Sequence, residues 1–291
     1  MPLLRKATRG AASHTILSNL EQEYMMNVVT LFNQKGGVGK TTNATHIAAG
    51  LAIKGKRVLL IDSDSQANAT TQMGIPDMPG IYNLLAQEQE WRKVLRAVNP
   101  RTFGDGQVKG QLYVLPSNVE TRAIPIVVGD VGLLRERLDE LVNEIDVVVI
   151  DTSPTPSLLH SMIYMATQYI IYPTECEMMS LTGLNKTVIN MEQLNKTRLL
   201  MGVAPVTLMG VQPMMYEPWT NAHDYGLSLL TNKFKRAVWP AIPKRTIWRD
   251  AAYSSTQRTI FAYESPDKQA KQKALSETWA LVARVEKGIV Q

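Results

Sequence analysis

The sequence predicts an α/β protein with three layers, α/β/α, in which a mostly parallel, doubly wound sheet is covered by helices on both faces. Two observations predict this fold. Short apolar segments alternate with helical patterns from residue 27 onward, and a glycine-rich run with two lysines follows the first apolar segment. The chain has 291 residues, of which 45% are hydrophobic. A chain of this length and composition can bury a large core, which excludes disorder as its main state.

The apolar segments are four to six residues long and are rich in Val, Ile and Leu, as expected for parallel strands buried on both faces. We place strands at residues 28–32, 58–61, 112–115, 147–150, 169–172 and 206–211. Helical spacing of apolar residues indicates amphipathic helices between them. The two clearest sets are Ala44, Ile47, Ala48 and Leu51, and Val131, Leu134, Leu138 and Leu141. We expect loops at 76–79 and 99–110, where turn formers and polar residues gather.

The ends of the chain suggest one domain with an amino-terminal extension. We predict a short helix within residues 1–26, because Ile16, Leu17, Leu20 and Tyr24 would share one helical face. Residues 27–291 contain no repeat and no clear linker, so we interpret them as a single domain. The single cysteine, Cys176, excludes an internal disulfide. No apolar run approaches the roughly 18 residues needed to cross a bilayer, and no membrane anchor is evident.

The clearest chemical signal is the run Lys35-Gly36-Gly37-Val38-Gly39-Lys40-Thr41-Thr42, which follows a predicted strand and opens a predicted helix. Glycines allow backbone N–H groups to surround phosphate oxygens, and the start of the helix adds positive potential. We expect Lys40 to neutralise phosphate charge and Thr41 to offer its hydroxyl to Mg²⁺. The commoner phosphate loop has a glycine at the position of Gln34, and here a lysine comes next instead.

This run resembles the deviant Walker A motif of the ParA/MinD group of P-loop ATPases. The resemblance implies that residues 35–42 bind ATP and that Lys35 crosses a dimer interface to the nucleotide of the other subunit. Lys35 and Lys40 would then both take part in catalysis. The cofactors implied are ATP and Mg²⁺, and the partner implied by Lys35 is a second copy of the chain in an ATP-bound homodimer.

Carboxylates follow two of the predicted strands, which should end at the same edge of a parallel sheet. Residues 62–70 resemble the family segment Asp-x-Asp-Pro-Gln-x-Asn-Ala-Thr, with Ser65 in place of the proline. By that match Asp64 orients or deprotonates the attacking water, and Asp62 lies near the outer shell of the metal. Asp151 ends a Walker B strand and would hold Mg²⁺ through water, so the predicted metal site consists of Thr41, Asp62 and Asp151. A serine at 65 frees the backbone after Asp64, and hydrolysis is therefore expected to be slower or differently triggered.

The resemblance extends over about residues 27–287. Residues 173–177 with 181–184 resemble the family's strand-to-helix segment, and residues 242–245 resemble a late loop that borders adenine in relatives. Pro243 is therefore a candidate for contact with the base. One departure is Trp219, which stands where relatives often have an arginine. Any contact made by that arginine in relatives must be lost here or supplied by another residue.

Positive charge gathers between residues 233 and 258, where a single acid, Asp250, interrupts the basic residues. Such a cluster could neutralise DNA phosphates without reading sequence, and binding of this kind weakens steeply with salt. The rival interpretation is a solvated surface with these residues on different faces. The predicted DNA-binding residues are Lys233, Lys235, Arg236, Lys244, Arg245, Arg249 and Arg258.

The function that the resemblance implies is ATP-dependent DNA segregation. ATP would drive dimerisation, the dimer would bind DNA non-specifically, and a ParB-like cargo adaptor would stimulate a slow ATPase and so release the DNA. The expected location is cytoplasmic and associated with the nucleoid. One alternative is a positioning factor for a non-DNA cargo. Another is a membrane-associated MinD-like ATPase, for which the last apolar pattern, from Leu275 to Val285, lacks a basic and aromatic tip.

Overall fold

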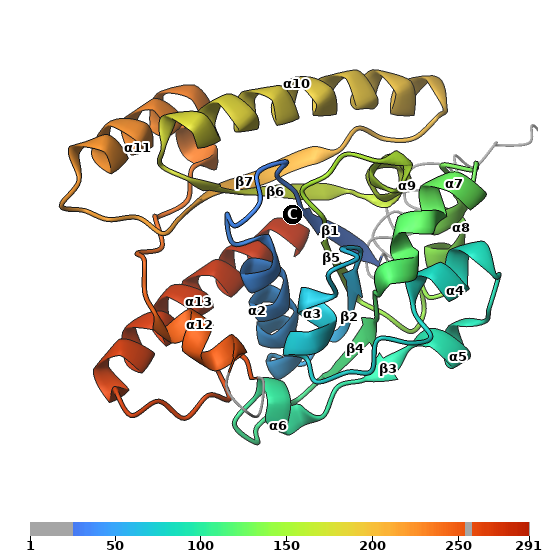
Figure 1. The fold of residues 1–291 in the computed structure, drawn as a ribbon, viewed down its shortest axis with the longest axis horizontal. Coiled ribbons are helices and arrows are strands. Elements are labelled where there is room, and N and C mark those ends of the chain that lie inside the picture. The colour runs from blue at the N-terminus through green and yellow to red at the C-terminus, as the bar shows by residue number, and fades with distance from the viewer. Residues whose placement is uncertain (1–25, 254–257, 291) are drawn as a thin grey trace, which may run out of the picture.

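One mostly parallel sheet organises the molecule, as predicted (Figure 1). The computed structural model describes residues 26–253 and 258–290, so the predicted amino-terminal helix lies outside the described residues. The sheet has seven strands in the order β3-β4-β2-β5-β1-β6-β7. Neighbouring strands run parallel except for β3 and β4, which are antiparallel. The carboxyl ends of the parallel strands therefore meet at one edge, which we call the phosphate edge.

The six predicted strands are confirmed, with ends shifted by up to three residues. They are β1 (Asn27–Leu31), β2 (Arg57–Asp62), β4 (Gln111–Leu115), β5 (Val147–Asp151), β6 (Tyr169–Glu175) and β7 (Thr207–Met214). The sequence did not predict β3 (Arg96–Ala97), which is too short to show an alternating pattern. The loop expected at 99–110 contains a short helix, α6 (Pro100–Phe103), because the Asn99 side chain accepts a hydrogen bond from the Arg101 N–H and caps it.

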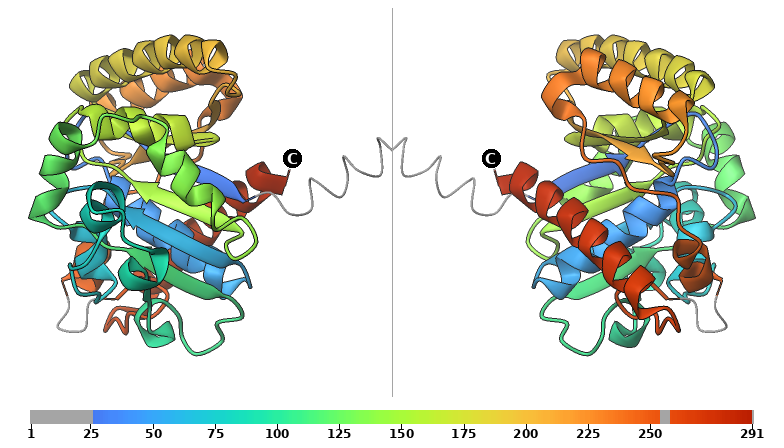
Figure 2. Two further views of the ribbon diagram at one scale, coloured as in Figure 1. Left: turned by 90° about the vertical axis from the view of Figure 1, so that its right-hand side faces the viewer. Right: turned by 90° about the vertical axis from the view of Figure 1, so that its left-hand side faces the viewer.

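Helices cover both faces of the sheet (Figures 1 and 2). On one face lie α2 (Lys40–Ile53), α12 (Ile247–Ala252) and α13 (Lys268–Val290), and on the other lie α4 (Ile81–Ala86), α5 (Trp91–Val94), α8 (Leu133–Asp139) and α9 (Leu158–Ala166). The long α10 (Met178–Leu200) and α11 (Asn221–Phe234) pack against β6 and β7. The remaining short elements are α3 (Asn68–Gln72), α7 (Ile124–Val127) and the 3-10 turns η1 (Val119–Ala123) and η2 (Lys235–Ala237).

The strand residues explain the layers. Successive side chains point to opposite faces, so in β1 Val29 packs toward α2 and α13 while Val28 packs toward α4, α8 and α9. The amphipathic interpretation of α2 is wrong, because every residue from 43 to 52 is buried. The reason is tertiary, since α13 packs on the outer side of α2. Gly50 permits this approach, and a Cβ there would lie 2.4 Å from Cγ2 of Val282.

The apolar residues of the last helix are used inside the domain. Leu281, Val282 and Val285 of α13 are buried in the same cluster as α2. Within the described residues, none of the helices combines the length and apolar character that a membrane span requires.

Candidate active site

The phosphate loop joins β1 to α2 at the centre of the phosphate edge. Gly37 and Gly39 have φ values of 78° and 86°, which is the left-handed region that disfavours side chains. Gly39 is also crowded, because a Cβ there would lie 3.0 Å from Cε of Met214. These glycines turn the backbone around the start of α2, where free N–H groups favour an anion.

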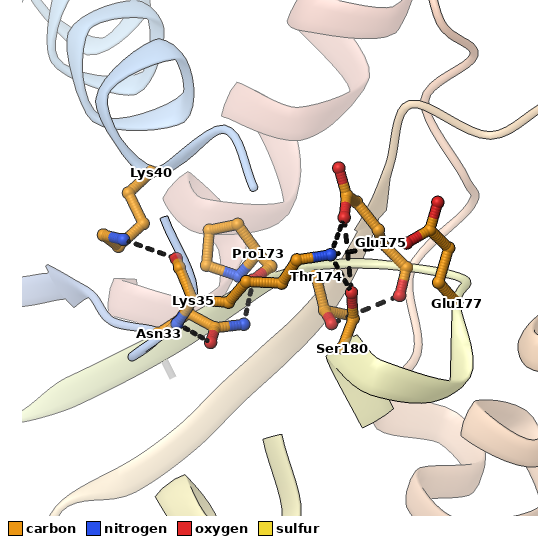
Figure 3. Close-up of polar contacts among 8 residues, drawn as sticks. All are labelled: Asn33, Lys35, Lys40, Pro173, Thr174, Glu175, Glu177 and Ser180. Atoms are coloured by element: carbon orange, nitrogen blue, oxygen red, sulfur yellow. Dashed lines mark hydrogen bonds and ion pairs between the residues drawn. The ribbon is translucent and has the colours of Figure 1, made fainter. Parts of the chain in front are cut away.

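Lys40 is buried beneath this loop. Its side chain folds back, and Nζ donates a hydrogen bond to the carbonyl oxygen of Lys35 at 3.0 Å (Figure 3). Burial lowers the pKa of Lys40, and the nearby charges of Asp151 and Asp64 oppose that shift. The ammonium is thus already placed at the loop, in a partly dehydrated setting where a phosphate charge is attracted more strongly than in water.

Two aspartates meet at the ends of neighbouring strands. Asp62 of β2 and Asp151 of β5 are partners in the parallel register, and both are fully buried. Oδ2 of Asp62 accepts hydrogen bonds from the Thr70 N–H at 2.9 Å and the Thr70 hydroxyl at 2.8 Å. Burial still raises the pKa of Asp62 to about 6. The strand register alone therefore brings these two carboxyl groups together, as the sequence predicted for strand-end acids.

Asp151 is the more perturbed of the two. Burial, followed by the charge of Asp62, raises the pKa of Asp151 to about 8. The Thr41 hydroxyl is near enough to lower that pKa in part, yet neither carboxylate oxygen has a hydrogen-bond partner of good geometry among the described residues. A buried carboxyl group without partners is costly unless a cation or a proton balances it.

The donors around Asp151 fit Mg²⁺. The hydroxyl of Thr41 and the carboxylate of Asp151 are hard oxygen ligands, and Asp62 stands beside them. No group of three His, Cys, Asp or Glu side chains suited to a metal occurs in the described part of the chain. Mg²⁺ is usually held by one or two carboxylates together with water and phosphate oxygens rather than by a complete protein cage.

Asp64 lies at the rim of the edge and is only half-buried. It lines a cavity of about 450 Å³ together with Ser65, Arg122 and Ser153. The Ser65 hydroxyl accepts a hydrogen bond of 3.0 Å from Nε of Arg122, so a side chain from η1 contacts the residue that replaces the family's proline. The sequence did not indicate Arg122, because no local motif contains it. Asp64 and Ser65 follow β2, whereas η1 follows β4.

Lys35 is held by its own chain (Figure 3). Its ammonium forms an ion pair with Glu175, donates to the Ser180 hydroxyl at 2.7 Å, and lies 3.4 Å from an oxygen of Glu177. Burial lowers the pKa of Lys35, but the hydrogen bond and charge of Glu175 and the charge of Glu177 outweigh it and raise the pKa. The sequence matched 173–177 to a family segment without giving these acids a role, and only the fold brings them to Lys35.

The predicted base-contacting loop lies beside the phosphate loop. Pro243 and Lys244 line a cavity of about 550 Å³ that also includes Thr41 and Thr42 at the start of α2. Met214, at the end of β7, and Trp248 of α12 line the same cavity. A mostly apolar cavity next to a phosphate loop could accommodate a nucleobase. The assignment of Pro243 to base contact stays a prediction.

The predicted DNA-binding residues have different surroundings. Lys233, Lys235 and Arg236 lie exposed at the end of α11 and in η2, whereas Arg249 lines the cavity beside Thr42. Two of the basic residues pair with acids that lie outside residues 233–258. Lys244 forms an ion pair with Glu217 at 3.0 Å, and Arg245 forms one with Glu277 at 2.7 Å. Arg258 donates to the carbonyl oxygen of Ala262 at 3.3 Å. The surface around Lys244 and Arg245 is therefore less positive than the count of charges within residues 233–258 predicts.

Comparison with known proteins identifies the family. A model of the AAA domain matches residues 26–201. The chain is 30% identical to the chromosome-partitioning ATPase Soj of Thermus thermophilus over 87% of this chain and 96% of the relative. A plasmid partition protein from Borrelia burgdorferi has a similar fold, with a TM-score of 0.67 at 21% identity over 90% of this chain and 99% of that one.

A second solved structure has a similar fold. Cobyrinic acid a,c-diamide synthase from Mycobacterium smegmatis, with bound ATP analogue and magnesium, aligns with a TM-score of 0.65 and 24% identity. The alignment covers 76% of this chain and 88% of that protein. At this identity the likeness concerns the fold alone.

Proposed function

We propose that this chain, which belongs to the ParA/Soj family of partition ATPases, is an ATP-driven switch that dimerises, binds DNA non-specifically and is released by hydrolysis. The observation that carries the proposal is the phosphate edge. It brings together a buried cation, Lys40, two buried acids, Asp62 and Asp151, and a half-buried acid, Asp64. A buried cation beside a glycine-rich loop suits phosphate binding, and a more accessible acid suits a reaction that uses water.

Each residue has a distinct role in the proposed reaction. Lys40 and the loop N–H groups hold the β- and γ-phosphates and stabilise charge that develops on them. Asp64 orients the attacking water or accepts its proton, and the 450 Å³ cavity beside it leaves room for that water. Thr41, Asp62 and Asp151 would hold Mg²⁺, which would neutralise negative charge on the phosphates. Lys35 would act in the dimer, on the nucleotide of the partner subunit.

DNA binding would follow dimerisation, because a dimer presents two copies of each basic surface. The exposed group formed by Lys233, Lys235 and Arg236 is the better candidate for phosphate contact. Lys244 and Arg245 are paired with acids. Cations that are already neutralised displace fewer counterions from DNA phosphates and so contribute less to DNA binding. A ParB-like adaptor on the cargo would stimulate hydrolysis and separate the dimer. The protein would then work in the cytoplasm on the nucleoid.

Gel retardation of unrelated DNA sequences tests this proposal, with no nucleotide, ADP or ATP at two salt concentrations. We expect retardation only with ATP and equally for all sequences. A Lys235→Ala, Arg236→Ala variant should bind more weakly, and each lost phosphate contact should lower the log–log salt slope by about 0.9. Arg245→Ala, Arg249→Ala is the matched comparison, and its effect should be smaller. The Lys235→Ala, Arg236→Ala variant should keep ATP turnover. Arg245 and Arg249 line the candidate nucleobase cavity, so ATP turnover of the comparison variant is measured together with its DNA binding.

The alternative is a positioning factor for a non-DNA cargo. The pairing of Lys244 and Arg245 with Glu217 and Glu277 favours it, since it reduces the free positive charge on that surface. If the wild-type protein binds no DNA in ATP at low salt, this alternative replaces DNA segregation. If the protein dimerises with ATP in the same experiment, the switch itself is retained.

A further inference from the structure

The ammonium of Lys35 is fully occupied within one chain. A lysine ammonium has three donors, and three acceptors surround it, namely Glu175, Ser180 and Glu177 (Figure 3). Glu175 ends β6, Glu177 directly precedes α10, and Ser180 lies in the first turn of α10. In this conformation Lys35 has no donor left for a phosphate of its own or of another subunit.

We propose that Glu175 is a positioning residue that holds Lys35 in its own chain and competes with nucleotide phosphate for the same ammonium. The proposal rests on the proposed function, in which Lys35 acts on a nucleotide in the dimer. Lys35 can reach a triphosphate only after it leaves Glu175. The strength of this ion pair therefore sets how much ATP is needed for dimerisation.

Glu175 is better placed than Glu177 for this role. Its side chain is 19% exposed, whereas that of Glu177 is 54% exposed and its oxygen is farther from Nζ, at 3.4 Å. The buried Ser180 hydroxyl lies 3.3 Å from the same Glu175 oxygen, so it borders both partners of the ion pair. Ion pairs weaken with exposure to solvent, so the Glu175 contact should carry most of the restraint.

The backbone under Lys35 is tied to the same strand by neutral hydrogen bonds. The Asn33 side chain donates to the carbonyl oxygen of Pro173 at 2.8 Å and accepts from the Lys35 N–H at 2.9 Å. These bonds fix the loop beside β6 without using charge. Removing the charge of Glu175 should therefore free the ammonium and leave the loop in place.

Glu175→Gln is the decisive variant, because glutamine keeps the shape and an acceptor oxygen and removes only the charge. With Mg²⁺ and a non-hydrolysable ATP analogue, sedimentation velocity should show half-maximal dimerisation at a roughly two- to fivefold lower analogue concentration, which is the size expected for a partly exposed ion pair. Glu177→Gln is the matched control and should shift this concentration less. Glu175→Asp restores the charge and should return the midpoint toward wild type.

Salt separates competition from a merely structural role. Rising ionic strength screens the Lys35–Glu175 pair, so the difference between wild type and Glu175→Gln should shrink. A structural defect would leave that difference unchanged. The proposal is overturned if Glu175→Gln dimerises at the same or a higher analogue concentration than wild type.

A second measurement keeps this test separate from the proposed function. Urea unfolding of Lys35→Ala, Glu175→Gln and the double variant gives the coupling of the pair in the nucleotide-free protein. If wild type does not dimerise with the analogue, the proposed function fails. Competition between Glu175 and phosphate for Lys35 must then appear in the monomer, where Glu175→Gln should bind the analogue roughly two- to fivefold more tightly than wild type. Absence of coupling, or an unchanged affinity in that case, overturns the inference.

Discussion

The two lysines of the phosphate loop are five positions apart and are in opposite situations. Lys40 is 6% exposed and its ammonium contacts a backbone carbonyl of the loop itself. The Lys35 side chain is 32% exposed and contacts three side chains, from the end of β6, the residue before α10 and the first turn of α10. The aspartates divide in the same way, since Asp62 and Asp151 are fully buried and Asp64 is half-buried.

We interpret this division as one between residues that would hold the nucleotide and residues that would act on it. Lys40, Asp62 and Asp151, which we call the inner group, are fixed by strand register and helix position before any nucleotide arrives. Lys35 and Asp64, the outer group, lie where water or another subunit can reach them. Loss of an inner residue should therefore affect binding and stability, and loss of an outer residue should affect turnover and assembly.

The largest effect is expected for Asp64→Ala. Because Asp64 is the proposed base or water-orienting group, ATP turnover should fall about 10²- to 10⁴-fold, with ATP affinity nearly unchanged. Turnover by phosphate release and affinity by calorimetry measure the two effects. Size-exclusion chromatography should show a dimer that persists in ATP. A fully active, monomeric variant would remove Asp64 from the mechanism and the outer group from catalysis.

Lys40→Ala should affect binding instead. It removes a buried cation that faces the phosphates, and such charge-assisted contacts are worth about 3 kcal/mol or more when one partner is lost, so the Kd for ATP should rise about 100-fold. Calorimetric titration with ATP measures it. Lys93→Ala, an exposed lysine on α5, is the control and should bind like wild type. An unchanged Kd for Lys40→Ala would contradict the phosphate-loop assignment.

Asp151 predicts a pH dependence of stability. The pKa of Asp151 is raised to about 8 in the folded state. At a pH between the ordinary aspartate pKa and about 8, Asp151 therefore keeps its proton in the folded protein and loses it in the unfolded chain. Stability must then fall as pH rises, by about 2 kcal/mol between pH 6 and 7.5. Urea unfolding without Mg²⁺ and nucleotide measures this slope.

The Asp151→Asn variant shows whether that slope belongs to the inner group. It should be more stable than wild type at pH 7.5 and nearly independent of pH, whereas Asp139→Asn, at an exposed site, should keep the wild-type slope. Mg²⁺ with ATP should flatten the wild-type slope, because a bound cation favours the ionised carboxylate. A stability that rises with pH in wild type would contradict the buried state of Asp151.

The smallest effect is expected for Lys35→Ala in the monomer. Because Lys35 contacts its own chain and not the site of the bound phosphates, the ADP affinity of the monomer should change by less than about fivefold. Fluorescence titration with a labelled ADP measures it, with Lys40→Ala as the contrasting variant. A loss as large as that of Lys40→Ala would erase the difference between the inner and outer groups.

Local patterns determined most of the fold and the centre of the site. Six strands, the phosphate loop and the strand-end acids were predicted because each depends on a short run of residues. The run 35–42 needs only a strand before it and a helix after it, and Asp62 and Asp151 end apolar segments whose parallel pairing fixes their register. The two-residue strand β3 and the short helix α6 were missed because so few residues show no periodicity.

What only the tertiary structure decided involves residues far apart in the sequence. Glu175 meets Lys35 across 140 positions, Glu277 meets Arg245 across 32, and α13 buries the outer side of α2. The sequence by itself predicted which residues would carry phosphate chemistry and placed them in their strands, loop and helix, because these signals act over a few neighbours. Which partners those residues contact depends on how separate elements pack, and no local pattern contains that information.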